Sequence, residues 1–211
     1  MFFLRTHRLH PCGASGLTYC QALKNTEGLQ ALSQLKTLHI HQAPELEALD
    51  SFDTLEALEQ LHLLNLYNLQ TLDGLEKNQS LRKIELRKAR QLDDIKAIAQ
   101  CSSLESINLQ WCTALLDLEP IASLKKLKSL DVSHCHALLC IQAISQLRDL
   151  HTLHLHTCPA LKNIDAIIPL KNLQVLSVDN DQPFPKPEQS FMLSRDIISE
   201  YQQKLKQAQS H

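Results

Sequence analysis

The chain has 211 residues, of which 44% are hydrophobic, 21% charged and only 4% aromatic, and its formal net charge is −2. This composition excludes a disordered chain, and the near-neutral charge lacks the basic footprint of a nucleic-acid-binding protein. Leucine alone accounts for 42 residues, a bias that points to an internal repeat.

The N-terminal segment carries no recognisable targeting signal. Only residues 1–4 are apolar before the first charge, whereas a signal-peptide core needs about 7–15 apolar residues. No stretch approaches the roughly 18 apolar residues of a membrane span. We therefore expect a cytoplasmic protein that contacts no membrane, with an exported bacterial effector as the alternative. Residues 1–34 are expected to form an N-terminal cap, because 12–34 hold a degenerate copy of the repeat that follows.

Residues 35–180 repeat with a strict period of 23. The unit LxxLxLxxxxxLxxLxxLxxLxx occurs in six full copies and one partial copy, and its apolar sites hold Leu, Ile, Val, Phe or Cys everywhere except at Asn78. Sites 4 and 6 alternate with polar residues, which predicts a half-buried strand. The apolar sites from 12 to 21 recur every third residue, which suits a 3-10 turn or a very short helix. One unit cannot bury its own apolar face, so successive units must stack.

Two segments, LKSLDVSHC (127–135) and LHTLHLHTC (150–158), resemble the signature of the leucine-rich-repeat family, LxxLxL followed by Asn or Cys. The resemblance covers about residues 12–180. The repeat length of 23 residues is similar to that of the short bacterial subclasses, and cysteine at site 9 is similar to the cysteine-containing variant. The resemblance implies a right-handed α/β solenoid shaped as an arc. A parallel β-sheet would line its concave face, and short 3-10 or α segments its convex face.

Cysteine occupies site 9 in three successive repeats, at Cys112, Cys135 and Cys158. The seven cysteines lack the paired spacing of zinc sites, so we interpret this column, with Cys20, as buried thiols that act as small hydrophobes. A redox or metal column is the alternative.

The C-terminal segment, 181–211, begins with a proline-rich connector and then shows helical periodicity. Pro183, Pro185 and Pro187 end the array, and Ser194 precedes apolar residues at Ile197, Ile198, Tyr201 and Leu205. We expect an amphipathic capping helix that covers the end of the leucine core; recruitment of a partner helix is the alternative.

Sites 3, 5 and 7 of each repeat point away from the leucine core, and site 8 lies at the edge of the strand. Leu64 and Trp111 are large apolar residues on this solvated side, and they flank Arg87 and Lys88. A cluster of aromatic residues and arginine is typical of interface hot spots. We predict that repeats two to five bind one protein partner through His62, Leu64, Tyr67, Glu85, Arg87, Lys88, Gln110, Trp111 and His134. Packing along the sheet edge is the alternative role for the apolar residues.

Charges at site 2 alternate in sign, so adjacent strands should pair opposite charges. They run Lys36, Glu59, Arg82, Glu105 and Lys128. This leaves Lys83, Arg87 and Lys88 unpaired, which favours an acidic protein surface over nucleic acid as the partner.

Histidines cluster at both ends of the array, with His39, His41 and His62 at one end and His151, His154 and His156 at the other. The first cluster contains no Glu or Cys and the second only Asp131, so neither supplies the base, nucleophile and oxyanion donors of a catalytic site. We therefore expect no enzymatic activity and no cofactor. Adventitious metal binding and a pH-sensitive interface stay open.

The sequence thus favours a non-enzymatic protein–protein interaction module, for which a bacterial effector is one setting that the resemblance implies. The alternatives are an adaptor subunit of a larger complex and a scaffold that associates with itself through Leu116 and Leu139. The chain could also be a fragment of a longer array.

Overall fold

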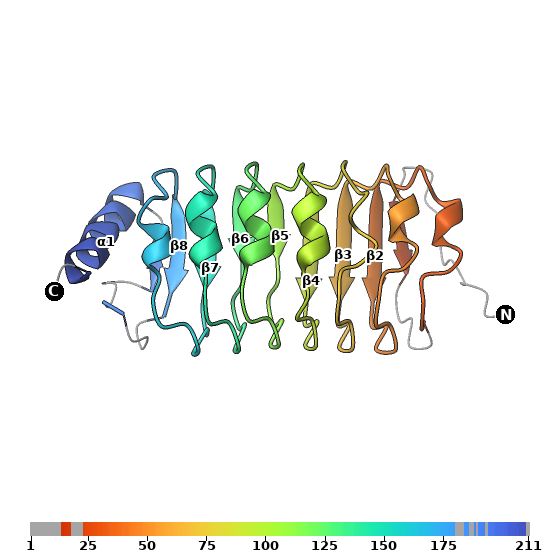
Figure 1. Ribbon diagram of the computed structural model, residues 1–211, viewed down its shortest axis with the longest axis horizontal. Helices are drawn as coiled ribbons and strands as arrows, with labels where there is room; N and C mark the ends of the chain where they lie inside the picture. The colour runs from red at the N-terminus through yellow and green to blue at the C-terminus, as the bar shows by residue number, and fades with distance from the viewer. Residues whose placement is uncertain are drawn as a thin grey trace.

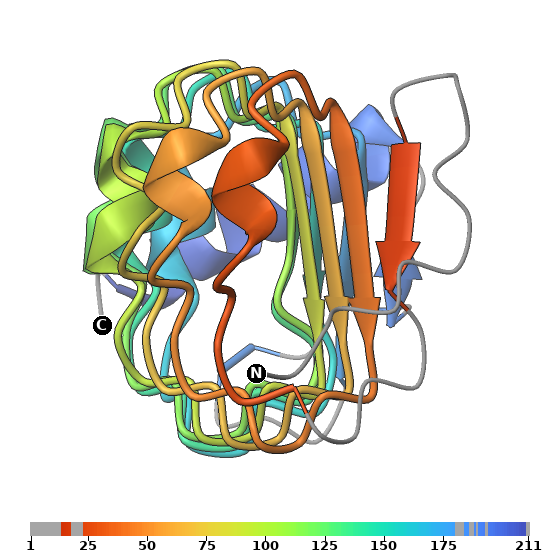
Figure 2. The ribbon, with the colours of Figure 1, turned by 90° about the vertical axis from the view of Figure 1, so that its right-hand side faces the viewer.

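The structure is a computed structural model that describes residues 14–17, 23–179, 184–185, 188, 190–192 and 194–209. The chain forms an elongated stack of repeats with a single sheet on one side and short 3-10 helices on the other (Figures 1 and 2). The strands follow one another in chain order: β1 (Ala14–Leu17), β2 (Thr37–His41), β3 (Gln60–Leu64), β4 (Lys83–Arg87), β5 (Ser106–Asn108), β6 (Ser129–Asp131), β7 (Thr152–Leu155), β8 (Val175–Val178) and β9 (Phe191–Met192).

The register of the sheet follows the sequence period. Thr37 lies opposite Gln60, Gln60 opposite Lys83, and Lys83 opposite Ser106, so each step between neighbouring strands is 23 residues. Strands β1 to β8 are parallel, which confirms the predicted sheet, whereas β9 runs antiparallel to β8. Equivalent sites of successive repeats therefore form columns across the sheet.

The apolar spacing of three produces 3-10 helices on the opposite side of the solenoid, as predicted. Each is closed by backbone bonds of the i to i+3 type, such as the Leu55 amide to the Phe52 carbonyl at 3.0 Å. Their bounds are η1 (Leu29–Ala31), η2 (Phe52–Thr54), η3 (Lys96–Gln100), η4 (Glu119–Ser123), η5 (Gln142–Gln146) and η6 (Asp165–Ile167).

A continuous leucine core runs between the sheet and the 3-10 helices, and its side chains are almost completely buried. The one polar residue in the repeat pattern, Asn78, is buried as well. Its Nδ2 donates to the carbonyls of Phe52 and Leu55 at 3.0 and 2.8 Å, so the amide bonds to the preceding turn instead of packing as an aliphatic group.

The cysteine column lies inside this core. Cys112, Cys135 and Cys158 are buried, and the Sγ of Cys135 donates to the Leu109 carbonyl at 3.2 Å. Burial raises the pKa of Cys112 and of Cys158 to about 12, so both thiols are protonated at neutral pH. They pack as small hydrophobes with a weak donor, which confirms the interpretation made from the sequence. Cys20 lies outside the described residues.

The C-terminal helix α1 (Arg195–Ala208) covers the end of the core (Figure 1). Ser194 caps it, since its Oγ accepts a bond from the Asp196 amide at 3.3 Å. The helix buries Ile198, Tyr201 and Leu205, which confirms the capping role.

A polar side chain of the same helix forms hydrogen bonds to carbonyl groups of the last 3-10 turn. The Nε2 of Gln202 donates to the Ile167 and Leu170 carbonyls at 2.7 and 3.2 Å. No helix in the described ranges is long and apolar enough to cross a membrane. The connector prolines Pro183 and Pro187 lie outside those ranges.

Candidate functional site

The candidate site is the exposed side of the sheet, which we call the sheet face and define as the side chains at sites 3, 5, 7 and 8 of the repeats. Burial alternates along the strands, as in β2, where Leu38 and Ile40 are buried while Thr37, His39 and His41 are partly exposed. The sheet face therefore presents the polar columns predicted from the sequence, with the leucine core behind them.

Site 8 has a backbone conformation that was not predicted from the sequence. In six successive repeats its residue has a positive φ, between 55° and 65°. These residues are Gln42, Asn65, Lys88, Trp111, His134 and Thr157. Residues other than glycine adopt the left-handed conformation at an energetic cost, which is smaller for asparagine. The repeat geometry therefore imposes it on most of these six residues.

Backbone hydrogen bonds stabilise this turn. The amide at site 8 donates to the carbonyl at site 7 of the next repeat, as from Lys88 to Gln110 at 2.9 Å and from Trp111 to Ser133 at 3.1 Å. At Thr157 the amide donates instead to the carboxylate of Asp179. The backbone at site 8, including that of Trp111, is thus fixed at the end of each strand.

The middle of the sheet face carries a mixed cationic and apolar cluster, the central patch, which consists of Leu64, Arg87, Lys88 and Trp111. Leu64 pairs with Arg87 across the neighbouring strands. Arg87 and Lys88 are exposed, whereas Leu64 and Trp111 are half-buried. The structure thus brings these predicted residues together on adjacent repeats.

Trp111, the only tryptophan of the chain, stacks on a neighbouring histidine. Its ring lies parallel to that of His134 at 4.1 Å between centroids, and His136 approaches it edge-on at 5.8 Å. Burial, and secondarily His136, lowers the pKa of His134, which favours the neutral ring at neutral pH. The stack leaves part of the indole exposed as a flat apolar surface.

Tyr67 is exposed by 38% of its surface and contacts Arg90, whose guanidinium carbon lies 5.3 Å from the ring centroid. The sequence interpretation missed Arg90 and His136 as neighbours of the aromatic residues. Both occupy site 10, the site of Tyr67, so an inspection of that column one period apart would have found them.

His62 and Glu85 interact with each other. The Nδ1 of His62 lies 2.8 Å from a carboxylate oxygen of Glu85, and His62 is almost fully buried. The ring of His39 stacks on that of His62 at 4.3 Å. The expectation that no carboxylate joins this histidine cluster was therefore wrong, because the register places Glu85 one strand from His62.

Glu85 also pairs with one of the basic residues. Lys83 was expected to be unpaired, but its Nζ lies 3.6 Å from Glu85, two residues along the same strand. Burial alone would raise the pKa of Glu85, but the bond to His62 and the charge of Lys83 hold it below its ordinary value. In the described part of the chain, Arg87 and Lys88 form no ion pair.

The predicted charge alternation at site 2 is confirmed for most steps. Lys36 pairs with Glu59 at 3.0 Å, while Glu105 pairs with Arg82 at 3.6 Å and with Lys128 at 2.7 Å. These pairs are exposed, so each contributes little to stability, but they neutralise the basic residues beside the sheet face.

Gln110 and Asp131 form the next polar contact on the sheet face. The Nε2 of Gln110 donates to Asp131 at 2.6 Å, and the Ser133 amide donates to the other carboxylate oxygen at 2.9 Å. The predicted residue Gln110 is thus held in place by a residue of the next repeat.

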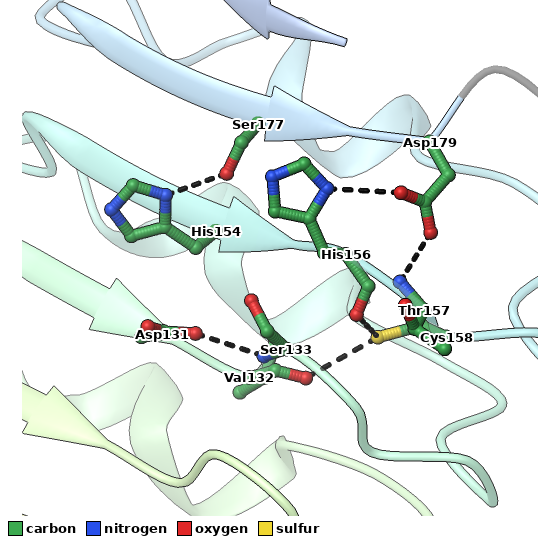
Figure 3. Close-up of polar contacts among 9 residues, drawn as sticks. All are labelled: Asp131, Val132, Ser133, His154, His156, Thr157, Cys158, Ser177 and Asp179. Carbon is green, nitrogen blue, oxygen red and sulfur yellow. Dashed lines mark hydrogen bonds and ion pairs between the residues drawn. The ribbon is translucent and has the colours of Figure 1, made fainter.

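The far end of the sheet face is a hydrogen-bonded histidine cluster (Figure 3). His154 lies 2.5 Å from the hydroxyl of Ser177, and His156 lies 2.9 Å from Asp179. Burial would raise the pKa of Asp179, but its bonds to His156 and to the Thr157 amide lower it.

Neither histidine cluster assembles a metal site within the described ranges, which contain no group of three or more His, Cys, Asp or Glu residues able to hold an ion. The arrangement on the sheet face consists instead of stacked rings, paired carboxylates and a cationic and apolar middle.

Comparison with known proteins agrees with this architecture. A family model described as Zer-1-like leucine-rich repeats matches residues 118–210. No curated protein matches the chain.

Several solved structures share the fold. The leucine-rich-repeat domain of the type III effector XopL is 24% identical with a TM-score of 0.64, and the match covers 83% of this chain and 67% of that one. An internalin (inlF) from Listeria monocytogenes is 20% identical with a TM-score of 0.51, over 70% of this chain. A second internalin (inlC2) from that organism is 18% identical with a TM-score of 0.51, over 75% of this chain and 77% of that one. The match spans about half, 48%, of the first internalin.

Proposed function

We propose that this chain, which has the leucine-rich-repeat fold, is a non-enzymatic interaction module that binds one protein partner on its sheet face. The central patch carries this proposal: Trp111 is half-exposed on the sheet face and stacked on His134, next to Lys88, a cation with no ion pair among the described residues. An exposed aromatic surface beside free cations has no role in the leucine core and is typical of interface hot spots.

The rigid backbone supports the same proposal. The left-handed turn at Lys88 and Trp111 and the strand pairing of Leu64 with Arg87 fix the patch before any partner arrives. Such preorganisation lowers the entropy that binding must overcome. The central columns provide room for a standard interface, of about 800 Å² on each side.

The test is quantitative capture of binding proteins from lysates of the source cell and, for the effector setting, of a eukaryotic host. Wild type is compared with Leu64→Asp combined with Trp111→Ala, and with a matched control, Leu116→Asp combined with Leu139→Asp. All three must show the same folded circular dichroism spectrum. We expect at least one protein to be lost only by the first variant. Equal recovery by wild type and both variants would contradict binding at the central patch.

A second candidate function is self-association as a scaffold. Leu116 and Leu139 lie one repeat apart, in the chain segments that connect β5 to η4 and β6 to η5, and they are exposed by 52% and 55%. Sedimentation velocity over a range of concentrations tests this candidate. It predicts a concentration-dependent size that the Leu116→Asp, Leu139→Asp variant abolishes, and a constant monomeric size would exclude it.

The biological setting is a further part of the proposal. XopL is named as a type III effector, and sharing its fold is compatible with an exported bacterial effector. An adaptor subunit of a larger complex and a cytoplasmic location are equally compatible with a sheet face that binds protein.

A further inference from the structure

We propose that the central patch recognises a protein segment in which acidic side chains lie next to a large apolar side chain. This proposal rests on the proposed function and adds the chemistry of the partner. It follows from the partners of the charged groups on the described sheet face. The carboxylates have partners within the chain, whereas the central cations form no ion pair with a described residue.

The carboxylates on the described sheet face are already engaged within the chain. Glu85 contacts His62 at 2.8 Å and Lys83 at 3.6 Å. Asp131 accepts bonds from the Gln110 side chain and the Ser133 amide. The third, Asp179, contacts His156 at 2.9 Å and accepts a bond from the Thr157 amide. These groups have little capacity left for a cationic partner.

The cations at the centre are not engaged in this way. Arg87 and Lys88 are consecutive and exposed, and neither forms an ion pair within the described ranges, whereas Arg82 and Lys128 beside the sheet face are both paired with Glu105. The unsatisfied charge of the sheet face is therefore positive and confined to two adjacent residues. Guanidinium and ammonium groups that lack internal partners favour carboxylates on an incoming protein.

Apolar surface lies directly beside these cations on both sides. Leu64 pairs with Arg87 on the neighbouring strand, and Trp111 occupies, one repeat later, the same site as Lys88. Neighbouring strands are about 4.8 Å apart, so Leu64 and Trp111 each lie about one strand spacing from a cation. A carboxylate held by Arg87 or Lys88 thus places a neighbouring side chain of the partner over Leu64 or the indole.

A nucleic acid fits this surface less well. A backbone of repeated phosphates needs a row of cations, whereas the central patch offers two, and the carboxylates of Glu85 and Asp131 both lie in the column of site 5, next to that of Arg87. The net charge of the chain, −2, gives no long-range attraction for phosphates.

The experiment is selection of a displayed library of random 12-residue peptides on the full chain, followed by titration of the selected peptides in solution. Because Trp111 is the only tryptophan, its fluorescence reports binding at the central patch when the probe peptide is synthesised without tryptophan. The charge variant is Arg87→Gln with Lys88→Gln. Its matched control is Lys126→Gln with Lys171→Gln, which removes the same charge from exposed positions elsewhere. Oligouridylate serves as the nucleic-acid probe.

We expect selected peptides to place Asp or Glu next to Phe, Leu or Ile, to change Trp111 fluorescence, and to bind more weakly as salt rises. The charge variant should weaken binding about tenfold, and the control variant should bind as wild type does. Selected peptides that are basic or uncharged, or that bind the charge variant equally well, would overturn the partner chemistry while leaving protein binding on the sheet face intact.

Two other results bear on the wider proposal. The Leu64→Asp, Trp111→Ala variant contains no tryptophan, so its affinity is measured by the fluorescence anisotropy of a labelled peptide. Peptides whose affinity is unchanged in this variant would overturn the choice of face, and hence the proposed function itself. Oligouridylate that binds more tightly than the selected peptides and loses affinity in the charge variant would overturn a protein partner in favour of nucleic acid.

Discussion

Left-handed backbone recurs at site 8, mostly on residues that do not favour it. Thr157 has a φ of 55°, although its branched Cβ makes this conformation costly, whereas Asn65 tolerates its φ of 61°. Since the turn recurs in every full repeat and its amides are bonded, the stacked fold compensates the local cost. Stability at this site should therefore depend on residue type in a predictable way.

We expect Thr157→Asn to increase the free energy of unfolding by about 0.5–1 kcal/mol, and the reciprocal Asn65→Thr to decrease it by a similar amount. Urea unfolding of both variants measures the two changes. A destabilising Thr157→Asn, or an Asn65→Thr that is neutral, would show that the backbone conformation is not what limits stability at site 8.

Histidines on the sheet face link stability to pH. Burial is the largest cause that lowers the pKa of His39, His134 and His154 below 6.5, and neighbouring histidines lower it further. The unfolded chain therefore binds more protons than the folded chain as pH falls through about 6.5. The stability that depends on neutral rings is complete above this pH and is lost progressively below it, toward the folded-state pKa values.

The folded protein should accordingly unfold at lower urea concentration at about pH 5.5 than at about pH 7.5. The carboxylates of Glu85 and Asp179 do not contribute to this change, because their lowered pKa keeps them ionised in this range. Replacing the three histidines by Gln should flatten the pH dependence, while His151→Gln controls for loss of one imidazole. An unchanged pH dependence in the triple variant would refute this assignment.

At the scale of elements, the terminal helix closes the solenoid with one face. In α1, Ile198 is buried against the end of the core, whereas the adjacent Ile197 is 36% exposed. The two residues have the same chemistry and the same helix propensity, so they form a matched pair for measuring what the capping contact contributes.

Ile198→Ala should lower the free energy of unfolding by about 2–3 kcal/mol, because it leaves a cavity under the cap, and Ile197→Ala should change it by less than about 0.5 kcal/mol. Equilibrium denaturation of both variants provides the measurement. Equal effects would indicate that α1 does not cap the core in solution.

The repeat period is what made most elements predictable. It determined the strand register, the buried columns and the 3-10 turns, because each is a direct consequence of apolar spacing. The two-residue strand β9 was not predictable, because it forms after the repeat pattern ends and pairs antiparallel. Site 8 was missed because only Asn65 and His134 in that column are residue types associated with positive φ.

Candidate site residues were predictable as columns but not as contacts. The period places Leu64, Arg87 and Trp111 on adjacent repeats, and the structure agrees. It does not tell which charges pair within the chain: the bond between Glu85 and His62 and the ion pair of Lys83 depend on side-chain rotamers. Those pairs determine which charges are available to a partner, since they leave Arg87 and Lys88 as the unpaired cations of the sheet face among the described residues.

In the whole molecule, the leucine core and the proposed binding surface occupy different parts of the solenoid. The leucine columns, the buried thiols and the cap hold the fold together, while the sheet face carries residues that the core does not need. The central patch can therefore vary in chemistry without unfolding the chain, which is how a repeat architecture supports binding to different partners.

The measurement that tests this account most directly is site-specific photo-crosslinking in the source-cell lysate. The crosslinking residue p-benzoylphenylalanine replaces either Leu64, on the sheet face, or Leu139, the exposed leucine away from it. If the partner binds the sheet face, it is crosslinked from position 64 and not from position 139. A partner crosslinked only from position 139 would contradict recognition on the sheet face.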